Sequence, residues 1–189
     1  MILFINTISL QSCIALYDSH LDFVGNTFWS AKGNESSTLI PHIESLLQAQ
    51  GVSYDDLSHV VVVHGPGSFT GVRTSVLVAN TLAYTLNIPV ASLGYFDLFN
   101  DYPIVKASSK RDVFFQKSKG ESIEIVSNDD LVSYLGSKSI SKIFGEMLDF
   151  LPEGVTVFDK INYETILSDR NLIWLDRIEP LYIKRPNIS

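Results

Sequence analysis

Apolar and polar residues in the first hundred positions fall into blocks that predict strands separated by turns and helices. Short apolar runs at 2–5 and 13–17 and a partly alternating segment at 21–29 predict three successive strands, because polar stretches separate them. Four β-branched residues at 60–63 predict a strand that is buried on both faces of its sheet. A further strand is expected at 88–93, with Pro89 among its first residues.

Two segments between these strands follow the helical period instead. In the first, apolar side chains recur at Leu39, Ile40, Ile43, Leu46 and Leu47. The hydroxyl residues at 36–38 are suited to cap this helix, and Gly51 is suited to end it. A glycine-rich turn at 65–71 leads into the second helix, over about 70–87. The pattern therefore predicts an α/β lobe with a mixed sheet.

The order of these elements resembles one lobe of the ribonuclease-H-like, or actin-like (ASKHA), fold shared by actin and sugar kinases. In the second half, we expect strands at 112–116, 122–127, 140–144 and 155–158, and short helices near 128–136 and 160–168. We therefore expect an α/β protein of two lobes with mixed sheets: a first ribonuclease-H-like lobe over 1–102 and a reduced second lobe over 103–189. The tail from 171 to 189 is expected to pack as an extended strap.

Composition and charge narrow the possible functions. The chain has 189 residues, of which 46% are hydrophobic and 19% charged, and this balance excludes a disordered chain. Residues 1–100 hold two basic and seven acidic side chains, so we expect no direct binding of nucleic acid by this half. We also expect no secretory leader, because residues 1–5 lack a basic region and Asn6 follows too soon for an apolar signal core. No membrane span is expected, because no uninterrupted apolar run approaches the ~18 residues that crossing requires. The expected location is the cytoplasm.

The segment GPGSFTGVR, between the strand at 60–63 and the second helix, is the clearest local motif. Its members are Gly65, Pro66, Gly67, Ser68, Phe69, Thr70, Gly71, Val72 and Arg73. Glycines and a helix start are compatible with a phosphate-holding loop, and equally with a tight turn closed by a helix cap. The motif is not a P-loop, because Val72 follows the last glycine where a lysine is required. Arg73 is expected to have a carboxylate or carboxy-terminal partner.

Metal and nucleophile chemistry find little support. The four histidines, His20, His42, His59 and His64, show no i, i+3 or i, i+4 pair on one helix, so structural or surface roles are expected. Cys13, the one cysteine, lies in an apolar strand and is expected to be a small core residue. The sequence therefore predicts no catalytic residues, no metal site and no cofactor.

Both helices of the first half carry few charges. Since helices that are apolar on more than one side are either buried or used in interfaces, we expect the two helices to form a partner interface. The interface candidates are Leu39, Ile43, Leu46, Leu47, Val72, Val76, Ala79 and Ala83. Leu77, Thr81, Tyr84 and Thr85 lie toward another side of the second helix.

Taken together, these motifs resemble the TsaB (YeaZ) family. The resemblance covers residues 1–100 and rests on GPGSFTGVR, on Leu39–Pro41 within the first helix and on Ile88–Pro89. The closing segment Pro180–Pro186 is similar to the end of the family's chains. Two departures are evident: Asn6 stands where the family usually has an aspartate, and ASKHA kinases use that aspartate for metal and phosphate. Residues 107–114 keep only fragments of the family's second-lobe motif.

The resemblance implies a non-catalytic subunit. TsaB proteins pair through the helices of the first lobe with TsaD, which transfers a threonylcarbamoyl group to the tRNA adenosine beside the anticodon. A TsaE-type ATPase joins them, and the same helices allow a homodimer. Two alternatives remain open: an enzyme of the actin-like superfamily, such as a small-molecule kinase or a peptidase, and a diverged dimeric paralogue that no longer binds TsaD.

Overall fold

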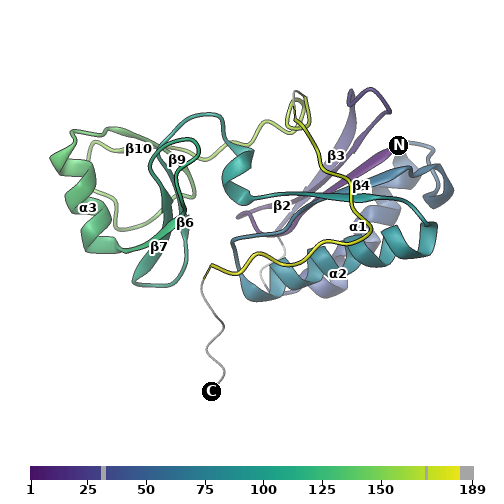
Figure 1. The fold of residues 1–189 in the computed structure, drawn as a ribbon, viewed down its shortest axis with the longest axis horizontal. Coiled ribbons are helices and arrows are strands. Elements are labelled where there is room, and N and C mark those ends of the chain that lie inside the picture. The colour runs from purple at the N-terminus through teal and green to yellow at the C-terminus, as the bar shows by residue number, and fades with distance from the viewer. Residues whose placement is uncertain (31–32, 169, 184–189) are drawn as a thin grey trace, which may run out of the picture. The chain divides into compact units, whose positions relative to one another are not determined.

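The computed structural model describes residues 1–30, 33–168 and 170–183, and its contacts divide the chain into two units (Figure 1). Unit 1 takes in Met1–Tyr95 and the chain from Asn162 onward, and unit 2 takes in Phe96–Ile161. This division differs from the expected second lobe of 103–189, because the C-terminal segment packs on the sheet of unit 1. The last six residues of the expected strap, which include the last three of the closing motif, lie outside the described residues.

Unit 1 is built on one mixed sheet whose five strands are those that the sequence predicts. They are β1 (Ile2–Asn6), β2 (Ser12–Tyr17), β3 (Phe23–Trp29), β4 (His59–Val63) and β5 (Val90–Leu93). Their order across the sheet is β3-β2-β1-β4-β5. The β1–β2 and β2–β3 pairs are antiparallel, whereas β1–β4 and β4–β5 are parallel. This arrangement confirms the expected ribonuclease-H-like order of elements.

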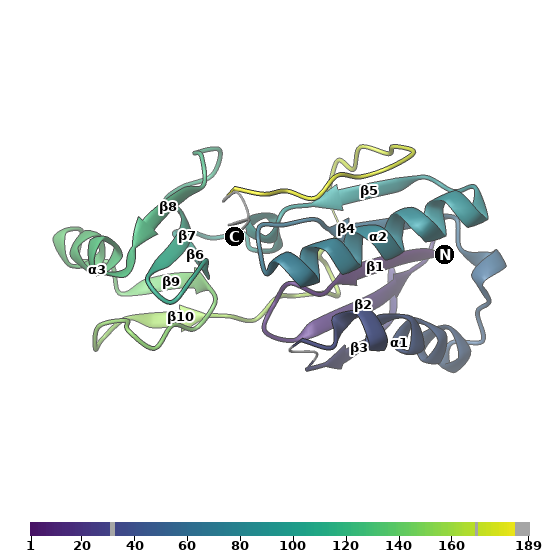
Figure 2. The same ribbon diagram turned by 90° about the horizontal axis from the view of Figure 1, so that it is seen from below.

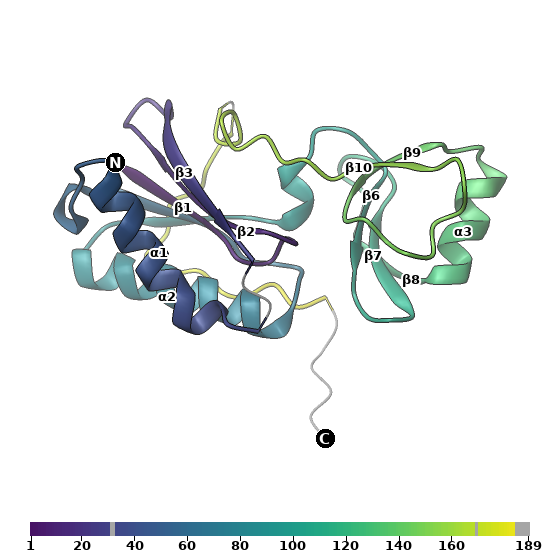
Figure 3. The ribbon, with the colours of Figure 1, turned by 180° about the vertical axis from the view of Figure 1, so that it is seen from behind.

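Two helices, α1 (Glu35–Ala49) and α2 (Phe69–Leu86), pack side by side on one face of this sheet (Figures 2 and 3). Strand residues pointing to this face form one hydrophobic core with the inner sides of both helices: Leu3, Ile5, Val60, Val62, Leu39, Ile43, Val76 and Ala79. Short 3₁₀ turns occupy Tyr54–Asp56 and Tyr95–Leu98. Within the described part of the chain, no helix is both long and apolar enough to cross a membrane.

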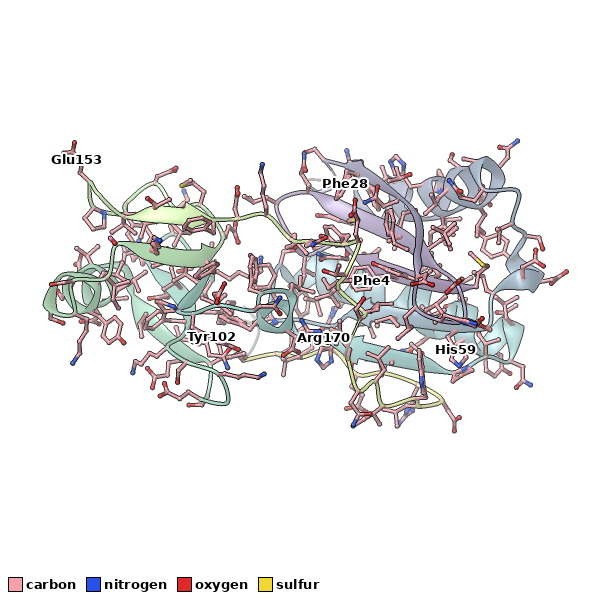
Figure 4. The ribbon with its side chains drawn as sticks, turned by 90° about the horizontal axis from the view of Figure 1, so that it is seen from above. Phe4, Phe28, His59, Tyr102, Glu153 and Arg170 are labelled. Atoms are coloured by element: carbon pink, nitrogen blue, oxygen red, sulfur yellow. The ribbon has the colours of Figure 1, made fainter. Side chains whose placement is uncertain are left out.

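The C-terminal segment, here called the strap (162–183), covers the other face and the β5 edge of the same sheet. Figure 4 looks onto this face, where the Tyr163 ring packs edge-on against Phe4 and Phe28. Leu175 then pairs with Val90 of β5 through two backbone hydrogen bonds. Residues 171–183 form no helix and belong to unit 1. The helix predicted near 160–168 is wrong, because residues 163–168 form turns.

Unit 2 repeats the strand order of unit 1 in a smaller form. Its strands are β6 (Ile104–Ala107), β7 (Asp112–Gln116), β8 (Glu124–Ser127), β9 (Lys142–Gly145) and β10 (Thr156–Phe158), with α3 (Asn128–Ser137) between β8 and β9. The sheet runs β10-β9-β6-β7-β8, with antiparallel pairs from β6 to β8 and parallel pairs from β6 to β10. Between β9 and β10 the chain forms no helix at the place where unit 1 has α2.

Strand β6 is the one strand of unit 2 that the sequence pattern misses, because a lysine interrupts its short apolar run. Lys106 is nevertheless buried, and its Nζ lies 3.0 Å from Oε2 of Glu146. Burial lowers the pKa of the Lys106 ammonium, and the Glu146 carboxylate acts in the opposite direction. A buried ion pair thus substitutes for the apolar residue that the pattern requires.

Replacing Glu146 by glutamine should lower the free energy of unfolding by about 3 kcal/mol near neutral pH, because it leaves a desolvated ammonium without its carboxylate. The pKa of Lys106 is lowered in the folded state, so the unfolded chain keeps the proton to higher pH. The loss of unfolding free energy in the Glu146→Gln variant should therefore become smaller as the pH rises toward 10.5, the ordinary pKa of a lysine. Urea unfolding at about pH 7 and about pH 9.5 measures both effects.

Glu124→Gln is the matched control, because the Lys117–Glu124 pair has a similar distance of 2.9 Å but lies on the surface. Its loss should stay within about 0.5 kcal/mol at either pH. Equal losses in the two variants would contradict the stabilising role of the buried pair.

Candidate functional site

The loop from Gly65 to Phe69 joins β4 to α2 and packs against the turn that follows β1. Ser68 caps α2, since its Oγ accepts a hydrogen bond from the Gly71 backbone N–H at 3.1 Å. A Cβ on Gly71 would lie 2.8 Å from the carbonyl oxygen of Thr7, and a Cβ on Gly67 would lie 2.8 Å from Cβ of Ile8. These two glycines therefore allow a close approach of the chain to itself.

Gly65 closes the other side of the loop in the same way. Its φ of +135° lies in the region that favours glycine, and an added Cβ would collide with the backbone of Leu181 in the strap. Thr7 Oγ1 also donates a hydrogen bond to the Gly71 carbonyl at 2.9 Å. The geometry favours the tight-turn interpretation of the motif over a phosphate cradle, because parts of unit 1 itself occupy the space beside the glycines.

Asn6, at the end of β1, lies at the centre of a buried polar cluster. Its Nδ2 donates to Ser9 Oγ and to the Tyr163 hydroxyl, both at 2.8 Å, and its Oδ1 accepts from the Ile8 N–H at 3.2 Å. The Tyr17 hydroxyl donates to the Tyr163 carbonyl, which fixes the strap a second time. The amide at position 6 therefore holds the strap against the sheet.

Cys13 and two of the histidines, His42 and His59, lie in surroundings that indicate structural roles. Burial raises the pKa of the Cys13 thiol well above its usual range, which disfavours a thiolate. His42 stacks on Trp29, and His59 packs on Trp174, each with ring centroids 4.3 Å apart. Across the residues that the structure describes, no group of three or more His, Cys, Asp or Glu side chains is placed to hold a metal ion.

The structure contradicts the partner-interface residues expected from helical periodicity. All of them are buried inside unit 1: Leu39, Ile43, Leu46, Leu47, Val72, Val76, Ala79 and Ala83. The reason is that the regular apolar stripe of each helix is the side that packs on the sheet. These residues form or adjoin the core and are not available to a partner.

A different side of each helix is exposed and carries large apolar residues among polar ones. It includes Ile40 from α1 and Leu77 and Tyr84 from α2, and we call it the outer face. Leu77 is 67% exposed and Tyr84 is 88% exposed, the two highest values among the large apolar residues of α1 and α2. The sequence contained the signal, because Leu77 and Tyr84 lie off the core stripe in a helix with one charged residue.

Arg73 borders the outer face and has aromatic neighbours in place of the expected carboxylate. Its guanidinium carbon lies 3.6 Å from the centre of the Phe69 ring, one turn earlier in α2. Its Nε donates to the hydroxyl of Tyr182, in the strap, at 3.2 Å. Within the described residues, no carboxylate pairs with it.

Two sheets of the same strand order, the first with paired helices on one face, define a protein of the actin-like (ASKHA) class. The crystal structure of an uncharacterised Pseudomonas aeruginosa protein with similarity to the peptidase YeaZ matches this fold. Its TM-score is 0.71 at 18% sequence identity, over 97% of this chain and 99% of that chain. At this level of identity, the likeness concerns the fold.

Sequence comparisons give a more specific relationship. The family model for TsaD, tRNA N6-adenosine threonylcarbamoyltransferase, matches residues 22–94. The tRNA threonylcarbamoyladenosine biosynthesis protein TsaB of Bacillus subtilis is 45% identical over 62 residues, which are 33% of this chain and 27% of that protein. A tRNA N6-adenosine threonylcarbamoyltransferase of Chlorobium phaeovibrioides is 22% identical over 144 residues, which are 76% of this chain and 39% of that protein.

TsaB proteins of several bacteria thus match part of this chain in sequence, and solved YeaZ structures match it in fold. The chain spans 27% of the length of the Bacillus subtilis relative. The TsaD family model matches the part of the chain that carries the signature loop and the two helices.

Two neighbouring residues of α2 lie on different sides of the helix, one in the core and the other on the outer face. Val76 is 3% exposed and Leu77 is 67% exposed. Val76→Glu should lower the free energy of unfolding by at least about 3 kcal/mol, because it places a lone charge in the core. Leu77→Glu should change it by no more than about 0.5 kcal/mol, as a surface substitution does. Urea unfolding of both variants tests this, and similar losses would mean that the outer face is not free.

Asn6→Asp tests whether position 6 is structural. The variant should lose about 1–3 kcal/mol of unfolding free energy at neutral pH, because both donor hydrogen bonds of Nδ2 are removed at a buried site. Desolvation raises the pKa of a buried carboxyl, so the folded state binds its proton more tightly than the unfolded state does. The loss should therefore diminish as the pH falls through the folded pKa.

Unfolding at about pH 5 and about pH 8 measures this dependence, and Asn171→Asp, at an exposed position, is the matched control. The Asn6→Asp variant should hydrolyse ATP no faster than the wild type. A gain of ATP hydrolysis would support phosphate chemistry at the signature loop.

Proposed function

We propose that the chain is a non-catalytic subunit of the TsaB type, which binds a TsaD-type catalytic subunit and supports threonylcarbamoyl transfer to the tRNA adenosine beside the anticodon. The observation that carries the proposal is the outer face of α1 and α2. It exposes Ile40, Leu77 and Tyr84 in the part of the chain that the TsaD family model matches.

The chemistry of the outer face suits an interface. Apart from Glu35, which is buried in the first turn of α1, the two helices contain two charged residues, Glu44 and Arg73. Large apolar and aromatic residues with few charges are typical of the centre of a protein–protein interface. A helix pair with such a surface is suited to pack against a second helix pair.

The non-catalytic role rests on the environment of the two groups with which ASKHA enzymes hold phosphate and metal. Asn6 has no carboxylate and directs its amide to Ser9 and Tyr163. The signature loop is packed by Ile8 and Leu181. Both elements have structural partners in unit 1, which supports a role in binding and not in chemistry.

The proposal includes the partners that TsaB proteins have. The outer face also serves a homodimer, in which a second copy competes with the TsaD-type subunit. A TsaE-type ATPase joins the complex, and the partner subunits hold the tRNA. The expected location of the complex is the cytoplasm. Positions 1–100 contain seven acidic and two basic residues, so this part of the chain is unsuited to hold tRNA phosphates itself.

Leu77→Glu and Tyr84→Glu should weaken association with the TsaD-type subunit of the same organism at least about tenfold, because each places a charge in the centre of an apolar contact. Calorimetric titration gives the affinity, and light scattering after size exclusion gives the mass of the complex. Ile173→Glu is the matched control, since Ile173 is equally exposed, at 72%, but lies in the strap.

Binding of the wild type and of the Ile173 variant, together with loss of binding in the helix variants, supports the proposal. A wild-type chain that forms homodimers but does not combine with the TsaD-type subunit would identify a diverged paralogue. Turnover of ATP or of a peptide by the chain alone would identify an enzyme.

A further inference from the structure

The end of the strap is fastened to α2 and to the signature loop by directional contacts. Asn80 of α2 holds the backbone of Ile178 with two hydrogen bonds, Nδ2 to the carbonyl at 2.9 Å and Oδ1 from the N–H at 2.8 Å. Three residues later, the Leu181 N–H donates to the His64 carbonyl at 2.8 Å. The backbone leading to Tyr182 is therefore fixed relative to α2.

These contacts of the strap position Tyr182 beside the Arg73 guanidinium. The Tyr182 hydroxyl accepts from Nε at 3.2 Å, and the Phe69 ring supports one side of the planar group at 3.6 Å. Tyr182 and Phe69 also pack against each other, with ring centroids 5.4 Å apart. Nε and one side of the plane are engaged. Among the described residues, no carboxylate pairs with the terminal Nη1 and Nη2 groups, which can bind a carboxylate in bidentate fashion.

The charge pattern around Arg73 requires an explanation. It is the one basic residue in α1 and α2, and its side chain is exposed at the border of the outer face. The described part of the chain supplies aromatic neighbours to it but no carboxylate. A guanidinium held in a fixed orientation loses little conformational freedom when an acidic group binds it, and this saving favours affinity.

We propose that Arg73, oriented by Tyr182 of the strap, is a preformed receptor for one acidic side chain of the partner that covers the outer face. This inference rests on the proposed function and adds the chemistry of recognition: the TsaD-type subunit supplies an aspartate or glutamate to Nη1 and Nη2 of Arg73. Tyr182 is then a positioning residue, and apolar contacts at Leu77 and Tyr84 provide the remaining contact area.

Arg73→Gln should weaken binding of the TsaD-type subunit roughly tenfold at low ionic strength and reduce the salt dependence of the affinity. Arg73→Lys should recover only part of the loss, because an ammonium lacks the planar pair of donors. Tyr182→Phe keeps the ring and removes the hydroxyl, and it should weaken binding severalfold while the salt dependence stays. A role in stability alone would leave the salt dependence of every variant unchanged.

The matched control is Arg177→Gln, because Arg177 is an exposed arginine of the strap whose nearest carboxylate, that of Glu179, is 3.8 Å away. It should bind within about twofold of the wild type, as a surface substitution outside an interface does. Thermal unfolding of each variant separates loss of binding from loss of folding. Charge reversal by Arg73→Glu, rescued by a lysine at one acidic position of the partner subunit, would establish the pair directly.

The outcomes distinguish the two proposals. If the wild type does not bind the TsaD-type subunit, the proposed function and this inference both fail. If the wild type binds and Arg73→Gln binds equally well with the same salt dependence, the receptor at Arg73 is refuted and the proposed function stands. Weakening of self-association alone, with unchanged binding of the TsaD-type subunit, also refutes it.

Discussion

The sheet of unit 1 must be covered on both faces, and most of the structure depends on this requirement. Its central strands, β1 and β4, are apolar on both sides, so a single layer of helices leaves half of their side chains without cover. The helices α1 and α2 take one face, and the strap takes the other. The buried cluster around Asn6 and Tyr163 then exists to fix the strap, since a buried polar group is stable only when its hydrogen bonds are satisfied.

The need to cover both faces of this sheet also explains which features can be predicted from the sequence and which cannot. The strands and helices of unit 1 follow from local periodicity, because each must bury a regular apolar stripe. Assigning those stripes to a partner interface fails for the same reason: the regular positions of α2, such as Val76, are needed by the sheet. The exposed large apolar residues of α2 include Leu77 and Tyr84, which lie off the regular stripe and which periodicity alone passes over.

Long-range contacts account for the remaining differences. Strand β6 is hidden because Lys106 is stabilised by Glu146, 40 positions later, which no local pattern contains. The segment at 163–168 has helical spacing but forms turns, since Tyr163 must reach Asn6 and the Tyr17 hydroxyl. The aromatic support of Arg73 by Tyr182 likewise joins residues 109 positions apart. In each case, a tertiary contact overrides the local signal.

Because unit 1 is assembled from the two ends of the described chain, its folding has a fixed order in time. Asn6 and Tyr163 are 157 positions apart, so a chain emerging from the ribosome exposes one face of its first sheet until Tyr163 has been made. The support of Arg73 forms later still, when Tyr182 arrives. Under the proposal made above, a partner that recognises Arg73 in this orientation would bind fully only to chains whose synthesis has passed Tyr182.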